Sequence, residues 1–145
     1  MAEHRIRLTW TDGGKPFTYE SYPREHEIVF KDGQDRLTAS ASPAYKGDGK
    51  HGDPEDLLVA ALSSCHMLSF LAICTKKKIT VQSYEDDAVG FLENEGGNLW
   101  ITKVILRPKI VSSADAATLE QIHHLAHKAC FIANSVKTQV TVEPR

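Results

Sequence analysis

One segment constrains the fold of this chain more than any other: the apolar run from Leu57 to Ile73, which follows a strong helix start. Asp53 is placed as the N-cap and Pro54 as the first helical residue. Two acidic residues follow in the first turn, where they favour the positive end of the helix dipole. From Leu57 to about Lys76 the helix is apolar on nearly every side. We therefore expect it to lie inside the protein or an oligomer, covered on most sides.

Polar residues interrupt this apolar run, at Ser63, Ser64, Cys65, His66 and Ser69. The run is therefore expected to be too short and too polar for a membrane span. The first ten residues contain no apolar stretch of the kind that signal peptides carry. Both observations predict a cytoplasmic protein without a membrane partner.

The residues before this helix have the patterns of strands. We predict four short strands, at residues 5–11, 17–22, 26–31 and 36–42, separated by turn residues. Their spacing favours an antiparallel meander. Residues 43–54 hold three glycines and two prolines and are predicted to be a loop.

The residues after the helix continue the pattern. Residues 79–93 and 99–111 are predicted to pair through a turn at residues 95–98. Ser113 is expected to cap a second helix, because apolar residues recur after it at helical spacing. Residues 135–144 are expected to close the chain as a strand. The sequence thus predicts an α+β fold with a single domain, residues 1–145.

Composition excludes some classes of function. The chain has 145 residues, 41% of them apolar and 25% charged, which is ordinary for a folded protein. Seventeen basic and nineteen acidic residues leave a net charge of −2, and no basic patch is evident. Nucleic acid is therefore not expected as a partner. Three cysteines in a cytoplasmic chain indicate buried thiols, metal ligands or redox-active groups, not a disulfide scaffold.

Cys65 is the first candidate for chemistry. A core thiol is the simplest interpretation, because free cysteine is among the most buried residue types. Its polar neighbours Ser63, Ser64 and His66 argue against a purely structural position. A reactive thiol needs a cation or a hydrogen-bond donor to stabilise the thiolate. Apart from His66, the same helix offers no cation, so we expect one from another segment.

The other two cysteines differ in what they can do. Cys74 lies nine residues after Cys65, half a turn out of phase and about 13 Å along the helix, so these two cannot form a disulfide. We expect Cys74 to be a packing residue. Cys130 can reach Cys65 only through tertiary folding. If it does, a peroxidatic cysteine and a resolving cysteine would suit the pair.

Histidines offer two other interpretations. His123 and His127 lie four residues apart and Cys130 follows three residues later, which is a spacing that zinc ligands can use. No CxxC or HExxH motif accompanies them. A Cys-His hydrolase with His66 as the base is a second alternative, but adjacent helical residues point about 100° apart.

Three segments together resemble the OsmC/Ohr family of thiol peroxidases, which reduce organic hydroperoxides. They are DPEDLLVAALSSCHM, ACFIANSVKTQVTVEP and FTYESYPREHEIVF. The resemblance covers residues 17–144. This chain departs from the common pattern at Pro23, where serine is frequent, and at Glu25, where aspartate is frequent.

The resemblance implies four site residues. Cys65 matches the peroxidatic cysteine and Cys130 the resolving cysteine. Arg24 matches the arginine that steadies the thiolate, and Glu55 matches the glutamate that partners this arginine. The implied reaction needs no cofactor and no metal. Its implied partners are an organic hydroperoxide, with hydrogen peroxide a poorer substrate, and an external dithiol such as a lipoyl-type reductant.

The resemblance also implies an intertwined homodimer, in which curved antiparallel sheets surround two long buried helices and the active sites lie at the subunit interface. On one straight helix Glu55 and Cys65 would lie about 15 Å apart and on different faces. We therefore expect each glutamate to serve the cysteine of the other subunit. The alternative function is a redox sensor or a small-ligand binding protein of the same fold, without useful turnover.

Overall fold

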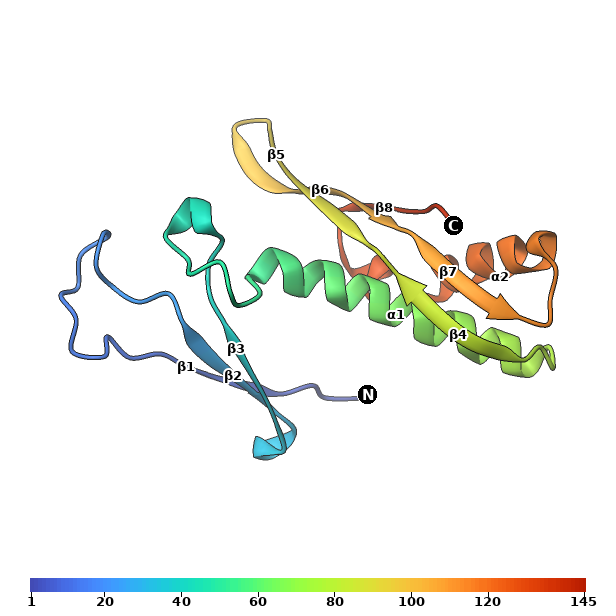
Figure 1. Ribbon diagram of the computed structural model, residues 1–145, viewed down its shortest axis with the longest axis horizontal. Coiled ribbons are helices and arrows are strands. Elements are labelled where there is room, and N and C mark those ends of the chain that lie inside the picture. The colour runs from blue at the N-terminus through green and yellow to red at the C-terminus, as the bar shows by residue number, and fades with distance from the viewer. The chain divides into compact units, whose positions relative to one another are not determined.

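The computed structural model describes all 145 residues (Figure 1). Contacts within the chain group it into two compact units, Met1–Leu57 and Leu58–Arg145. Three strands precede the first α-helix, four strands separate it from the second, and one strand follows, so the predicted α+β class is confirmed.

The first unit is built on a three-stranded antiparallel sheet, ordered β1-β2-β3. The strands are β1 (Ile6–Thr9), β2 (His26–Phe30) and β3 (Asp35–Ala39). The central strand β2 places Ile28 opposite both Leu8 of β1 and Leu37 of β3. Short 3-10 helices follow β2 and β3, at Lys31–Gly33 and Pro43–Tyr45. Ile28, Val29 and Ala39 are the buried apolar residues of this unit.

The predicted strand at residues 17–22 is wrong. Local turns occupy this segment, because the amide of Thr18 donates to the carbonyl of Pro16 and the amides of Ser21 and Tyr22 donate to the carbonyl of Thr18. The hydroxyl of Thr18 also donates to the Ser21 hydroxyl (2.9 Å). These local bonds use the backbone groups that a sheet would need.

The long apolar helix forms where the sequence predicts it, as α1 (Pro54–Lys76). Asp53 caps it, since its Oδ1 accepts from the Asp56 amide (2.9 Å), and the Asp56 carboxylate accepts in return from the Asp53 amide (3.2 Å). By length and composition alone α1 could cross a membrane, so the expectation that the run is too short and too polar was wrong on that ground. One stripe of α1 packs in the core of the second unit.

The two segments predicted to pair after α1 do pair, but each is divided into two strands. These are β4 (Val81–Asp86), β5 (Val89–Glu95), β6 (Asn98–Leu106) and β7 (Pro108–Ser112). β4 pairs with β7 and β5 with β6, all antiparallel. At the break the carboxylate of Asp86 accepts from the Arg107 amide (2.6 Å). A side chain thus replaces one backbone hydrogen bond between the strands, and Pro108 has no amide hydrogen to donate to another such bond.

The second helix is α2 (Ala116–Ala129), and the last strand is β8 (Gln139–Val142), which pairs in parallel with β6. The prediction that Ser113 caps α2 is wrong. Asp115 is the N-cap, and its Oδ1 accepts from the Thr118 amide (2.8 Å). The Ser113 hydroxyl instead accepts from the Thr80 amide (3.2 Å), next to the start of β4.

One stripe of α1 forms the core of the second unit, with residues four apart: Leu62, His66, Phe70 and Cys74. Leu62 packs against three buried residues of β6, namely Ile101, Val104 and Leu106. Phe70 and Cys74 pack against Ile122 and Ala126 of α2. The expectation that Cys74 is a packing residue is therefore confirmed.

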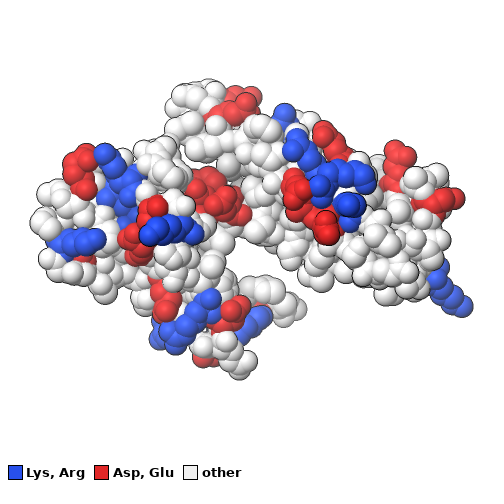
Figure 2. Space-filling view, viewed as in Figure 1, with Lys and Arg blue, Asp and Glu red and all other residues white.

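Charged side chains of both signs are interspersed on the face drawn in Figure 2. Ion pairs there and elsewhere join neighbours on the surface, as Arg36 with Glu27 (3.1 Å) and Lys46 with Glu20 (2.9 Å). Pairs of this exposed kind contribute little to the free energy of folding.

Candidate active site

The two cysteines of the predicted pair come together inside the second unit. Cys65 lies in the middle of α1 and is partly buried, whereas Cys130 is the C-cap of α2 and is fully buried. Burial raises the pKa of the Cys130 thiol, and the neighbouring Cys65 raises it further through a hydrogen bond and through its charge. Both cysteines are free thiols. Tertiary folding therefore places a partly exposed thiol beside a buried one.

The chain after α2 surrounds the Cys130 sulfur with amide groups. The amide of Ala133 donates to Sγ (3.4 Å), and the amide of Ile132 also lowers the pKa of this thiol. The carbonyl of Cys130 accepts from the amide of Asn134 (3.1 Å). These contacts fix the sulfur at the start of the 3-10 helix Ala133–Ser135. Amide donors stabilise a thiolate, so they partly offset the effect of burial.

A buried histidine pair joins the two helices that carry these cysteines. His66 Nε2 and His123 Nδ1 are 3.0 Å apart, and the two rings are stacked at 9° with centroids 5.3 Å apart. Burial lowers the pKa of His66 to about 4, and the neighbouring His123 and His127 lower it further. Burial also lowers the pKa of His123 to about 4, although Asp86 opposes this. Both imidazoles are therefore neutral at pH 7.

This pairing bears on the two alternatives that the sequence left open. His123 directs Nδ1 at His66, and no group of three or more histidine, cysteine, aspartate or glutamate side chains is close enough to hold a metal ion. The zinc arrangement of His123, His127 and Cys130 is thus not assembled. His66 is likewise engaged with His123, as expected for a residue that points away from its neighbour Cys65.

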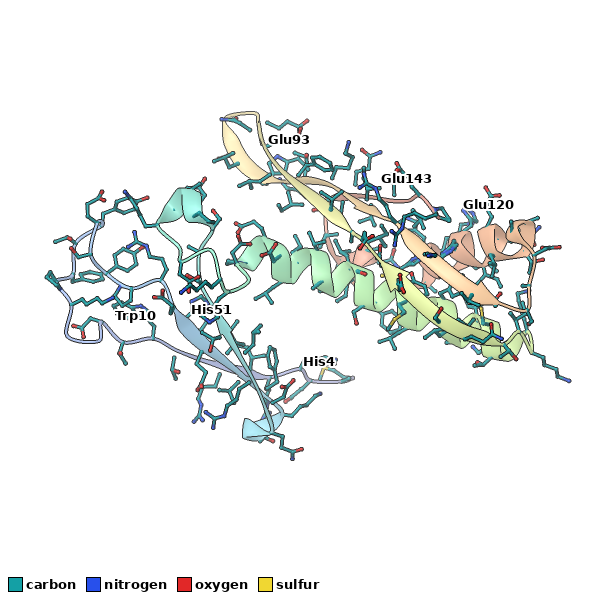
Figure 3. All side chains as sticks on the ribbon, viewed as in Figure 1. His4, Trp10, His51, Glu93, Glu120 and Glu143 are labelled. Atoms are coloured by element: carbon teal, nitrogen blue, oxygen red, sulfur yellow. The ribbon has the colours of Figure 1, made fainter.

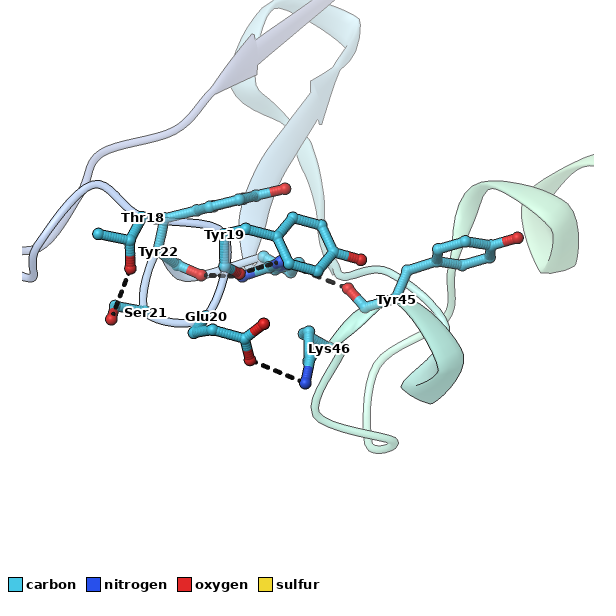
Figure 4. Close-up of polar contacts among 8 residues, drawn as sticks. Thr18, Tyr19, Glu20, Ser21, Tyr22, Tyr45 and Lys46 are labelled. Atoms are coloured by element: carbon cyan, nitrogen blue, oxygen red, sulfur yellow. Dashed lines mark hydrogen bonds and ion pairs between the residues drawn. The ribbon is translucent and has the colours of Figure 1, made fainter.

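Arg24, the predicted cation, is buried within the first unit. Its guanidinium donates to three backbone carbonyls, those of Tyr19 (2.6 Å), Tyr22 (2.6 Å) and Tyr45 (3.2 Å). It also lies over the ring of Tyr22, 3.6 Å from the centroid. Figure 4 shows these three tyrosines gathered from two loops. No carboxylate bonds to this guanidinium, so its positive charge is not neutralised by a salt bridge.

Glu55 lies in the first turn of α1 and is partly buried. Its carboxylate takes part in none of the five ion pairs of the chain. Arg24 and Glu55 belong to the first unit and the two cysteines to the second. Of the four predicted residues, Cys65 and Cys130 are therefore the two that the structure brings together.

Reasoning from the sequence missed two features of these sites. The first is the histidine pair, for which a signal exists: His66 continues the stripe of Leu62 and Phe70 at a spacing of four residues. The second is Ser40, which is buried at the end of β3 with a hydroxyl that has no hydrogen-bond partner. No sequence pattern around Ser40 would have predicted this.

Comparison with known proteins identifies the family and the fold. The family model described as OsmC-like protein matches residues 47–145. The chain therefore belongs to the OsmC-like family, as the sequence resemblance predicted.

Solved structures support this assignment. An OsmC-like protein of unknown function from Vibrio cholerae is 44% identical, with a TM-score of 0.92 and 100% of both chains covered. The organic hydroperoxide resistance protein OsmC from Legionella pneumophila is 18% identical, with a TM-score of 0.74 over 99% of this chain and 96% of that one. This second likeness shows the fold alone.

The uncharacterised protein YmaD of Bacillus subtilis (strain 168) is 26% identical over 89 residues. The match covers 61% of this chain and 58% of that protein, so it spans little more than half of the relative's length.

Proposed function

We propose that this protein is a thiol peroxidase that reduces organic hydroperoxides, with Cys65 as the peroxidatic cysteine and Cys130 as the resolving cysteine. The observation that carries the proposal is the contact between a partly exposed thiol and a buried thiol on two different helices. Family membership and the names of relatives such as the Legionella protein support it.

The reaction follows from the chemistry of the two thiols. The Cys65 thiolate attacks the terminal oxygen of the hydroperoxide, the O–O bond breaks, and the alkoxide leaves and takes up a proton to become an alcohol. Cys65 is then a sulfenic acid, oxidised by two electrons. The Cys130 sulfur attacks the Cys65 sulfur, and water leaves as the intrachain disulfide forms. An external dithiol, for which a lipoyl-type compound is the candidate, reduces this disulfide by thiol–disulfide exchange.

Arg24 is the cation in this proposal. Its guanidinium carries no salt bridge within the chain, and the three tyrosine carbonyls leave two of its five hydrogens free. Glu55 would accept one of these hydrogens and hold the guanidinium, while the other donates to a peroxide oxygen and the positive charge stabilises the thiolate. Because Glu55 lies ten residues before Cys65 on the same helix, we propose that it serves the cysteine of a second subunit.

A homodimer completes the proposal, with both units of each chain forming one OsmC-like domain in the cytoplasm. The exposed apolar residues of α1 support a second copy. Leu68 is 60% exposed although it lies in the middle of an apolar helix, and Ala60, Ala61 and Ala72 are exposed as well. An apolar helix with one buried stripe is expected to be covered by another chain.

A redox sensor is the second candidate. Burial raises the pKa of the Cys130 thiol, and a thiol that ionises less readily forms the disulfide more slowly. A long-lived sulfenic acid at Cys65 would suit a sensor, which oxidises once and does not cycle.

The deciding experiment is consumption of cumene hydroperoxide by the purified protein with a dithiol reductant, comparing the wild type with Cys65→Ser, Cys130→Ser and the control Cys74→Ser. A peroxidase requires many turnovers by the wild type and by Cys74→Ser, and none by Cys65→Ser. Consumption that stops after about one equivalent per chain would favour the sensor. Equal activity of the wild type and Cys65→Ser would exclude both.

A further inference from the structure

The first unit contains an exposed cluster of aromatic rings beside Arg24. Trp10, Phe17 and Tyr22 pack against one another, with ring centroids 6.0 Å apart for Trp10 and Phe17, 6.3 Å for Trp10 and Tyr22, and 5.7 Å for Phe17 and Tyr22. Trp10, labelled in Figure 3, is fixed because its indole nitrogen donates to the Pro23 carbonyl (2.7 Å). These contacts hold the three rings in place, although the Phe17 side chain is 78% exposed.

These rings line a cavity of about 570 Å³ that lies within the first unit. A volume of this size is typical of sites for small organic molecules. The walls are mainly apolar, and Leu8 of β1 and Ala41 after β3 complete them. A ligand with a ring could make edge-to-face contacts with Trp10 and Phe17, which a linear chain cannot match.

Two buried polar side chains, Arg24 and Ser40, also line this cavity. Arg24 uses one hydrogen on each guanidinium nitrogen for the three tyrosine carbonyls, which leaves a second hydrogen on each terminal nitrogen without an acceptor. Ser40 is 1% exposed, and its buried hydroxyl has no hydrogen-bond partner. The cavity thus offers hydrogen-bond donors and one hydroxyl among aromatic walls.

The geometry points to arylalkyl hydroperoxides, in which a carbon atom separates the ring from the O–O group, as the preferred substrates, with the ring seated among Trp10, Phe17 and Tyr22. This inference rests on the proposed peroxidase function and names the substrate class for it. The guanidinium hydrogen that Glu55 leaves free donates to a peroxide oxygen, and the hydroperoxide O–H donates to the Ser40 hydroxyl. The redox step is the one given above, and the leaving group departs as the aryl-bearing alcohol.

Kinetics of the full-length protein test this selectivity. We compare kcat/KM for cumene hydroperoxide with that for n-nonyl hydroperoxide, which has the same number of carbon atoms but no ring. The wild type should prefer cumene hydroperoxide. Phe17→Leu should lower the preference about two- to tenfold, the range expected for the loss of one aromatic contact. The control is Trp100→Leu, on the β5–β6 hairpin, which should keep the wild-type preference.

Binding of the product alcohols separates this inference from the proposed function. In the Trp100→Leu background Trp10 is the only tryptophan, so its fluorescence reports on ligands in the cavity. Cumyl alcohol should bind more tightly than 1-nonanol, and Phe17→Leu should remove the difference. Selective binding without any peroxide turnover would support the aryl site and refute the peroxidase. Turnover without preference for the ring, or equal binding of the two alcohols, would overturn the aryl site.

Discussion

Three buried groups set the chemistry at the scale of single residues. Cys130 is a buried thiol whose pKa is raised, and His66 and His123 are buried imidazoles whose pKa is lowered to about 4. Burial disfavours the charged form in each case, so it acts in opposite directions on an acid and on a base. The Cys130 thiol and the two imidazoles are therefore neutral at pH 7.

The histidine pair predicts an acid-sensitive fold. In the unfolded chain both imidazoles bind protons near pH 6.5, whereas in the folded chain they resist protonation until about pH 4. Because the unfolded state binds more protons in this window, stability is complete above pH 6.5 and falls as the pH drops to 4. The loss should reach about 3 kcal/mol at most for each histidine. Urea unfolding at several pH values measures it.

His123→Gln should remove about half of this acid-dependent loss, since one of the two titrating groups is gone. His124→Gln is the matched control, because His124 is the exposed neighbour on the same helix. An unchanged pH dependence in His123→Gln would show that the pair is not the origin of the effect.

The sequence predicted single residues unevenly. The resemblance named Cys65 and Cys130 as partners, and the two thiols are close enough for Cys65 to raise the pKa of Cys130, while their redox roles stay a prediction. Arg24 was predicted as a cation, but two of its three carbonyl partners, Tyr19 and Tyr22, come from turns that the sequence pattern assigned to a strand. The spacing of His66 from Leu62 and Phe70 indicates that His66 is buried, but its contact with His123 depends on tertiary packing and carries no local signal.

At the scale of elements, the sequence predicted a helix start correctly where one set of capping residues is present, and incorrectly where two residues compete as the N-cap. The cap of α1 combines Asp53, Pro54 and two acidic residues, and the helix begins where they predict. For α2 both Ser113 and Asp115 are suitable caps, and the choice depends on Thr80, which engages Ser113. Interruption of the long hairpin by Asp86 could not be read from the alternating pattern that surrounds it.

The loop after β3 predicts a sensitive position at Gly47. A Cβ at this residue would lie 1.5 Å from the Ala41 carbonyl oxygen, so any side chain forces the backbone to move. The same loop presents the Tyr45 carbonyl to Arg24 (3.2 Å). Gly47→Ala should therefore destabilise the protein by about 1–3 kcal/mol and reduce peroxide turnover.

Gly52→Ala is the control, because a Cβ there would lie 3.8 Å from Asp56 atoms, which is an ordinary contact. Thermal unfolding and kcat/KM, measured side by side, check both variants. Equal stability and equal activity of the two variants would show that the loop does not hold Arg24 in place.

At the scale of the whole molecule, the exposed apolar surface of α1 is the feature that one chain leaves unexplained. Only four residues of this 23-residue helix are buried. The sequence predicted an α1 covered on most sides, and the single chain covers one stripe. A sequence pattern reports that a surface is apolar, but it does not say whether the same chain or a second copy covers it.

The proposed dimer predicts a strong effect at Leu68. Leu68→Glu places a charge on the exposed apolar side of α1 and should convert a dimer into a monomer or weaken it at least tenfold, because burying an unpaired charge is costly. Leu92→Glu is the control, since Leu92 is an exposed leucine on β5. Sedimentation velocity distinguishes the species. A monomeric wild type would refute the dimer and, with it, the role of Glu55 across subunits.

The central claim is that Cys65 and Cys130 are a redox pair, and mapping of the thiols after a single oxidation tests it most directly. The reduced protein is mixed with one equivalent of cumene hydroperoxide and no reductant, alkylated, and digested for mass spectrometry. The account predicts an intrachain disulfide between Cys65 and Cys130, with Cys74 alkylated as a free thiol, and no disulfide in Cys65→Ser. A Cys65 that stays a free thiol in the wild type, or a disulfide that involves Cys74, would contradict it.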